Sequence, residues 1–262
     1  MTDENPLVLR QDEAGVTTLT LNRPAARNAL SRGMIAALRE AVGALAADAS
    51  VRVVILTGAG PGFCAGHDLK EVRAHQDEPG YAEALFGECA ELMLAIVRLP
   101  KPVIAQVHGV ATAAGCQLVA TCDLALAAAD ARFATPGVNI GLFCSTPMVA
   151  LSRNASPKQA MQMLLTGDLI DAQTALRFGL VNEVVPAEGL AERTAAVARQ
   201  LAAKSALTLA IGKDAFYRQL EMPLAAAYDY TRQAMVENLQ TLDAREGIAA
   251  FIDKRPPLWC GR

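Results

Sequence analysis

Two short stretches of small residues could present backbone N–H groups to an anionic oxygen. The first is Ala65–Gly66, which precedes His67 and a predicted helical turn beginning at Asp68. The second is Ala113–Gly115, between a predicted strand and a predicted helix. Small side chains leave the backbone open to a ligand, and N–H groups at the start of a helix carry partial positive charge. The two stretches could therefore converge on one oxyanion.

Residues 57–72, TGAGPGFCAGHDLKEV, also invite comparison with nucleotide-binding loops, because glycines follow a strand. The spacing does not fit that interpretation. A dinucleotide fingerprint needs glycine where Phe63 stands, and a Walker loop needs Gly-Lys-Ser or Gly-Lys-Thr, which the sequence lacks. We therefore rank nucleotide binding below oxyanion binding.

The three histidines and six cysteines show no metal-ligand spacing, so no metal site is predicted. His67 could serve as a base beside the oxyanion. His108 ends a predicted strand and is expected to hydrogen-bond to backbone, whereas His75 lies in a polar run and is expected to be solvated. The cysteines form no C-x-x-C pair and are expected to be reduced thiols.

Alternating strand and helix patterns must position these residues. Strands are predicted at 7–10, 16–21, 51–57, 103–107, 124–128 and 132–135, the first two as a hairpin. Helical periodicity follows Ser31 and recurs over 85–97, and residues 111–121 are expected to hold a helix with its entry loop. Beyond about residue 145, strand signals nearly vanish apart from 181–185, and helical patterns dominate at 191–204 and 223–240. The chain is therefore predicted to be α/β with a helical annex.

Composition narrows the classes of function. The 262 residues carry a formal net charge of -3, which argues against a dedicated nucleic-acid binder. No run reaches the roughly 18 apolar residues of a membrane span. The N-terminal MTDENPLVLR begins with acids and resembles no targeting segment, so we expect a cytoplasmic protein.

Four sequence blocks resemble the enoyl-CoA hydratase/isomerase family, also called the crotonase superfamily, over nearly the whole chain. They are RNALSRGMIAAL, VVILTGAGPGFCAGHDLKEV, KPVIAQVHGVATAAGCQLVATCDLALAAADARFATPGVNIGLF and LLTGDLIDAQTALRFGLVNEVVP. The resemblance implies a ClpP/crotonase-like fold of repeated ββα units. It further implies a CoA-thioester-binding core at 1–200, and a helical region at 201–262 for trimerisation and active-site closure.

The same resemblance implies site residues. The oxyanion donors would be the backbone amides of His67 and Ala114, polarising a thioester carbonyl and stabilising an enolate-like intermediate; the ring of His67 is not implicated. Coenzyme A would enter as part of the substrate, with no permanently bound cofactor. Its adenine and phosphates would lie near five residues, two of them from the C-terminal region: Arg27, Ala65, Lys70, Phe251 and Lys254. Family members assemble as homotrimers, commonly paired into hexamers.

The chain departs from the family pattern where the hydratases carry two glutamates. It has Gln117 and Gly137 at those positions, and neither side chain can exchange a proton near neutral pH. The related naphthoate synthases also have glycine at the later position and use an aspartate further along, where this chain has Cys144. Cys144 is thus a candidate catalytic group, although we favour a buried apolar thiol. The stretch TPGVNIGLFCSTPMVAL most resembles the enoyl-CoA hydratase domain-containing protein 3 branch, in which the glutamates are likewise replaced.

Two hypotheses follow. In the first, the chain is a lyase- or isomerase-type enzyme of CoA-thioester or fatty acid metabolism, with proton chemistry from water held by Gln117, from Cys144, or from the substrate. In the second, it is a non-catalytic acyl-CoA binder or structural oligomer. Gln117 could equally brace its helix or hold a water or substrate oxygen.

Overall fold

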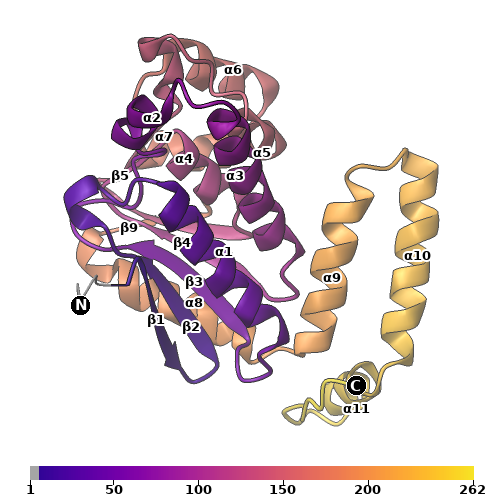
Figure 1. Ribbon diagram of the computed structural model, residues 1–262. Coiled ribbons are helices and arrows are strands. Elements are labelled where there is room, and N and C mark those ends of the chain that lie inside the picture. Colours follow the sequence, from indigo (N-terminus) through magenta and orange to yellow (C-terminus); the bar gives the residue numbers. More distant parts are fainter. Residues whose placement is uncertain (1–5) are drawn as a thin grey trace.

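A six-stranded sheet forms the centre of the computed structural model, which describes residues 6–262 (Figure 1). Its strands, in spatial order, are β1 (Val8–Glu13), β2 (Val16–Leu21), β3 (Val53–Gly58), β4 (Val103–Val107), β6 (Leu124–Ala128) and β9 (Glu183–Val185). The first pair is antiparallel and every later pair is parallel. The hairpin turns at Ala14 and Gly15, both of which have positive φ, as the tight turns between antiparallel strands require. The predicted hairpin is confirmed.

A second sheet has three strands, which fall between strands of the first sheet in the sequence. It contains β5 (Val110–Thr112), β7 (Arg132–Ala134) and β8 (Ile170–Asp171). The strands β5 and β8 were not predicted, since runs of three and two residues carry no period-2 pattern. The strand β5 matters for the site, because it leads directly into α4 (Ala114–Thr121).

Helices cover both faces of the large sheet. On one face lie α1 (Arg32–Ala47), α3 (Tyr81–Arg98) and α4, and on the other lies α8 (Leu190–Ala202). The strand β3 shows why both faces are needed: Val54 and Leu56 pack into the larger core, whereas Val53 and Ile55 pack against α8. Five further helical segments surround the three-stranded sheet and the loops: α2 (Leu69–His75), η2 (Pro136–Ile140), α5 (Pro147–Asn154), α6 (Pro157–Thr166) and α7 (Ala172–Phe178).

The C-terminal helices α9 (Ala206–Gln219), α10 (Leu224–Gln240) and α11 (Leu242–Ile252) stand beside the core (Figure 1). Lys213 of α9 fixes this group to the core. Its Nζ donates to the carbonyls of Ile96 and Lys101, both at 3.0 Å, and to Asp123 Oδ2 at 2.7 Å. Tyr217, one turn further on, donates to Asp123 Oδ1 at 2.9 Å. The helical annex expected from the sequence is therefore present, while α9 itself was not predicted.

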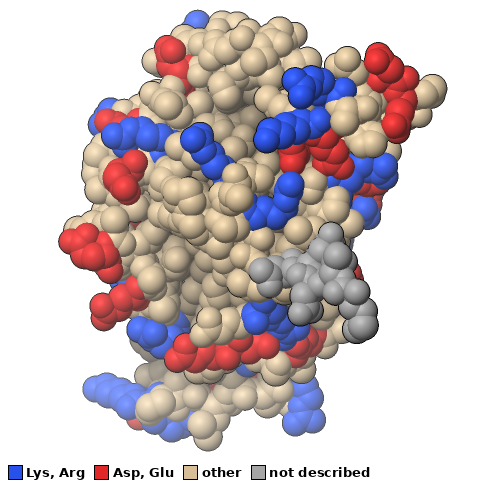
Figure 2. Space-filling model, turned by 60° about the vertical axis from the view of Figure 1, so that its left-hand side comes forward, with Lys and Arg blue, Asp and Glu red and all other residues tan. Residues whose placement is uncertain are grey.

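Charge is spread over the surface rather than concentrated. On the face shown in Figure 2, basic and acidic side chains surround a broad uncharged central area. In the described part of the chain, no helix combines the length and apolarity needed to cross a bilayer. Residues 1–5, which open the N-terminal stretch used above to argue against a targeting segment, lie outside the described residues.

Candidate functional site

The two small-residue stretches meet in the folded chain. The loop after β3 runs beside β5: Cys64 N–H donates to the Val110 carbonyl at 3.1 Å, and Thr112 N–H donates back to the Cys64 carbonyl at 3.0 Å. This pairing carries Gly66 onto the start of α4. A Cβ atom placed on Gly66 would lie only 3.3 Å from the Ala114 nitrogen, so the Gly66–His67 peptide and the Ala114 N–H are neighbours.

Gly66 and Ala113, which precede the two N–H groups, have unusual backbone conformations. Gly66 has φ +90°, and a side chain there would also meet the Thr112 carbonyl at 2.9 Å. Ala113, the N-cap of α4, has φ 50° and ψ -119°, a combination that residues with a side chain rarely adopt. It is held by a hydrogen bond from its own N–H to the Ala134 carbonyl at 2.9 Å. Strain of this kind is retained where the surroundings fix it, and Ala113 directly precedes the N–H of Ala114.

Neither donor is used within the described part of the chain. The N–H groups of His67 and Ala114 have no hydrogen-bond acceptor among residues 6–262, although Ala114 is only 1% exposed. Nearly all buried backbone N–H groups in native proteins are paired. Two adjacent unpaired donors of this kind have the character of a site for one small anionic oxygen.

The site also contains Gln117, one turn into α4. Its side chain is 5% exposed, and its Oε1 has no hydrogen-bond partner within the described chain. Gln117 therefore does not cap or brace its helix through that oxygen. This favours the second of the two interpretations left open above, in which the amide meets a ligand or water.

Gly137 leaves no room for a longer side chain. A Cβ atom there would meet the Leu142 carbonyl oxygen at 2.5 Å and Cys144 Sγ at 2.9 Å. The loop after η2 has thus folded over the place where the hydratases begin their second glutamate. Burial raises the pKa of the Cys144 thiol, so it stays protonated near neutral pH and packs as an apolar group. This agrees with the interpretation of Cys144 as a buried apolar thiol.

Two of the five candidate CoA-binding residues are in contact, since Ala65 N–H donates to the Arg27 carbonyl at 3.0 Å. Lys70 lies in the first turn of α2. Arg27 and Lys70 are both exposed. The loop before α2 and the start of α2 therefore carry two exposed cations close in sequence to His67.

Phe251 and Lys254 are not brought to this group within one chain. Phe251 lies in α11 and Lys254 follows it, while Figure 1 shows α11 at the opposite end of the molecule from α2. Asp243 holds α11 there, accepting from Ser205 Oγ at 2.5 Å at the start of α9. A role for these two residues at the CoA site would therefore require a second copy of the chain.

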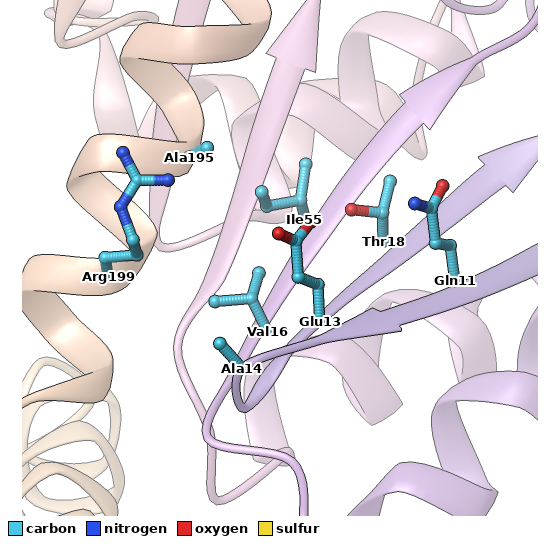
Figure 3. A pocket seen from close by; sticks show the side chains of 8 residues that line it. All are labelled: Gln11, Glu13, Ala14, Val16, Thr18, Ile55, Ala195 and Arg199. Atoms are coloured by element: carbon cyan, nitrogen blue, oxygen red, sulfur yellow. The ribbon is translucent and has the colours of Figure 1, made fainter.

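Two surface hollows are present elsewhere. One lies between α8 and the first strands; Figure 3 shows Gln11, Glu13 and Thr18 on the sheet, with Arg199 reaching over from α8. The other lies between α9 and α10, lined by residues such as Asp214 and Tyr230. Neither includes an oxyanion donor. No group of three or more metal-binding side chains gathers within the described residues.

Thr135 and Tyr81 carry buried polar atoms that no sequence pattern indicates. Their hydroxyl oxygens have no partner in residues 6–262, and the same holds for both ring nitrogens of His67, the possible base. Their burial depends on loops far apart in sequence, so no local pattern could have indicated it.

The chain is similar to known proteins in both sequence and structure. The chain is 48% identical to enoyl-CoA hydratase domain-containing protein 3, mitochondrial, of Xenopus laevis, covering 97% of this chain and 86% of that protein. The crystal structure of an enoyl-CoA hydratase from Mycobacterium smegmatis matches with a TM-score of 0.94 and 55% identity, over 97% of this chain and 99% of that one. The structure of human enoyl-CoA hydratase domain-containing protein 3 matches with a TM-score of 0.93 and 46% identity, over 97% and 100%.

These relatives correct one expectation. We expected a cytoplasmic protein from the acidic N-terminal stretch, but the rat, Xenopus laevis and human relatives of that name are all designated mitochondrial. The cytoplasmic assignment is contradicted. An argument from the first ten residues alone could not support it.

The match to the family extends over nearly the whole chain. Residues 11–262 match the model of the enoyl-CoA hydratase/isomerase family, and the structural matches confirm the crotonase fold expected from the sequence blocks. This chain belongs to the enoyl-CoA hydratase/isomerase family.

Proposed function

We propose that the chain binds acyl-CoA thioesters and holds the thioester carbonyl oxygen between the N–H groups of His67 and Ala114. The observation that carries this proposal is the close approach of two N–H groups without an acceptor, the Ala114 nitrogen lying 3.3 Å from a Cβ position on Gly66. Negative charge develops on the carbonyl oxygen as an enolate forms. One such donor typically contributes about 10²–10³-fold in rate.

The cations at Arg27 and Lys70 support the coenzyme part of the proposal. Both are exposed; the Arg27 carbonyl accepts from Ala65 N–H, and Lys70 lies in the first turn of α2, three residues after His67. Phosphate groups bind strongly to guanidinium and ammonium groups. Coenzyme A would thus be recognised as part of the substrate, with its phosphates over this loop.

Hydration of an enoyl-CoA is not the reaction that this site supports best. Gln117 cannot donate or accept a proton near neutral pH, and Gly137 is closed off by the loop of Leu142 and Cys144. Loss of acid–base assistance typically lowers a rate by about 10²–10⁴-fold. We therefore expect enolate stabilisation with little addition of water.

Two measurements test this function. Isothermal calorimetry with saturated and unsaturated acyl-CoAs should show binding that weakens in Lys70→Ala. A panel of enoyl-CoA, 3-hydroxyacyl-CoA and branched thioesters should then be assayed beside a relative that carries both glutamates. Absence of acyl-CoA binding would overturn the proposal, and binding with no change in any thioester would leave the non-catalytic alternative.

We also propose that the chain assembles as a homotrimer, alone or as a dimer of trimers. The supporting observation is the apolar surface of α10, where Leu224 is 74% exposed and Tyr228 71%. Large exposed apolar surfaces are typical of subunit interfaces.

A further inference from the structure

The His67 ring is a buried titratable group for which the proposed function has no use. Neither ring nitrogen has a hydrogen-bond partner in the described chain. The ring packs edge-on against Phe86 of α3, with centroids 5.4 Å apart and planes at 83°. His108, by contrast, places its Nε2 3.0 Å from the Gly60 carbonyl. His108 is satisfied by the protein, and His67 is not.

Three other side chains share this property. His67 immediately precedes α2, and Tyr81, which stacks on His75 of α2 at 5.0 Å, begins α3. Gln117 lies in α4, and Thr135 follows the Ala134 carbonyl that holds the N-cap of α4. Each of the four has a buried polar atom without a partner in residues 6–262. Nearly all buried polar atoms in native proteins have a partner, so these four side chains are candidates for contact with a ligand.

The protonation state of the ring suits it to accept a proton. Burial lowers the pKa of His67, and the nearby Leu30 carbonyl offsets part of this effect without meeting hydrogen-bond geometry. The ring is therefore neutral near pH 7, with one N–H and one lone pair. A carbonyl near one ring nitrogen favours the proton on that side and leaves the other nitrogen as the acceptor.

The side chains of Gln117, Cys144 and Cys116 cannot act as the proton acceptor. An amide such as Gln117 does not exchange protons near neutral pH. Burial raises the pKa of Cys144, and raises that of Cys116 to about 12. Of these groups, the imidazole alone can both accept and return a proton under ordinary conditions.

We propose that the imidazole of His67 is a catalytic residue that moves a proton at the α-carbon of the bound thioester, an inference that rests on the proposed binding mode. In this proposal the ring, carried by the residue whose N–H holds the carbonyl oxygen, lies beside the α-carbon. Its lone pair takes the α-proton, and the C–H electron pair becomes the enolate double bond. The carbonyl π electrons move to the oxygen held by His67 and Ala114. The imidazolium then returns the proton to the α-carbon or, when the chain has a β,γ double bond, to the γ-carbon of the dienolate.

Exchange of α-protons for deuterium isolates this step from any later chemistry. Butyryl-CoA and octanoyl-CoA are incubated with protein in D₂O, and deuterium at the α-carbon is followed by NMR. The wild-type protein should accelerate exchange over buffer. His67→Gln keeps the backbone N–H and loses the proton acceptor, so exchange should fall by about 10²-fold or more while the Kd for the acyl-CoA changes little.

His75→Gln is the matched control, because His75 is exposed and interacts with Glu78; its exchange rate should equal that of wild type. Added imidazole should restore part of the exchange in His67→Ala. Unchanged exchange in His67→Gln, or no exchange by a wild-type protein that binds butyryl-CoA, overturns the inference and leaves the binding proposal standing. Failure of both acyl-CoAs to bind would instead overturn the proposed function.

A measurement on the wild-type protein covers the case in which the variants do not fold. With ¹⁵N-labelled histidine, the ring signals of His67 should shift when butyryl-CoA is added, whereas those of His75 should not. A His67 ring that does not respond to a bound acyl-CoA contradicts the inference.

Discussion

The two positions at which the family's hydratases carry glutamate have changed in different ways in this chain. At Gln117 the side chain remains in place, buried and without a partner for its oxygen. At Gly137 the space itself has gone, because Leu142 and Cys144 occupy it. The first change is one of chemistry and the second is one of shape, so they should respond differently to mutation.

Gln117→Glu should restore part of a hydratase rate. The carboxylate would occupy the place of the amide and supply one of the two missing proton-transfer groups, a gain of at most about 10²-fold. Hydration of crotonyl-CoA is the measurement, with Gln117→Ala as the control that removes the side chain. Adding Gly137→Glu should give no further gain, and an additional increase in the double variant would contradict the steric account.

Gly137→Ala should destabilise the fold, since its Cβ would lie 2.5 Å from the Leu142 carbonyl oxygen. Overpacking of this kind typically lowers the free energy of unfolding by about 1–3 kcal/mol. Gly87→Ala is the matched control: Gly87 lies within α3, nothing stands within 4 Å of its Cβ position, and the change should raise stability by about 0.5–1 kcal/mol. Urea unfolding distinguishes the two, and equal stabilities would count against the proposed loop packing.

At this scale the sequence predicted the backbone donors but not their surroundings. Gly66 and Ala113–Gly115 are local signals, because small residues beside a helix start point to accessible N–H groups. The unpaired ring of His67 and the closure over Gly137 depend on contacts with α3 and with the loop after η2. No spacing in the sequence encodes those contacts.

The anchoring of α9 shows how one element is positioned by a few polar contacts. Lys213 is nearly buried, with 8% of its side chain exposed, and it joins Asp123 to two carbonyls of the core. No clear amphipathic pattern marks α9 in the sequence, whereas five or more regularly spaced apolar residues predict α1 and α3. Helices held by polar contacts lack the periodicity on which prediction relies.

Lys213→Met should lower the free energy of unfolding by about 3 kcal/mol, because it leaves a largely buried Asp123 without its cation. Methionine keeps the length of the side chain, so the loss reports on charge rather than volume. Lys158→Met in α6 is the control, since Lys158 is exposed and forms no ion pair in the described chain. Chemical denaturation would compare them, and a Lys213 variant as stable as wild type would contradict the anchoring role.

The whole molecule combines a well-covered core with an apolar C-terminal group. Helices cover both faces of the large sheet, while α10 buries only Ala227 and exposes Leu224, Tyr228 and Met235. A surface of this kind is stable in water when another subunit covers it. The α/β core and the annex were readable from strand and helix periods, but how the annex stands beside the core was not, since that depends on the Lys213 contacts.

Sedimentation should therefore give a mass of three or six chains of 27.6 kDa. Leu224→Asp with Tyr228→Asp should dissociate the assembly, because each places a charge in an apolar contact. Leu9→Asp is the control, on an exposed position of β1 outside the C-terminal helices. A monomeric wild-type protein would contradict the proposed assembly.

The central claim is that the amides of His67 and Ala114 hold a thioester carbonyl, and the vibration of that carbonyl tests it most directly. Two N–H donors weaken the C=O bond, so difference infrared spectra of an acyl-CoA with a ¹³C-labelled carbonyl should show its stretch at lower frequency when bound to wild-type protein. The shift should be absent with Gly66→Ala, whose Cβ would lie 3.3 Å from the Ala114 nitrogen and 2.8 Å from the Ala113 Cβ. A bound thioester whose carbonyl stretch stays at its value in water would contradict the account.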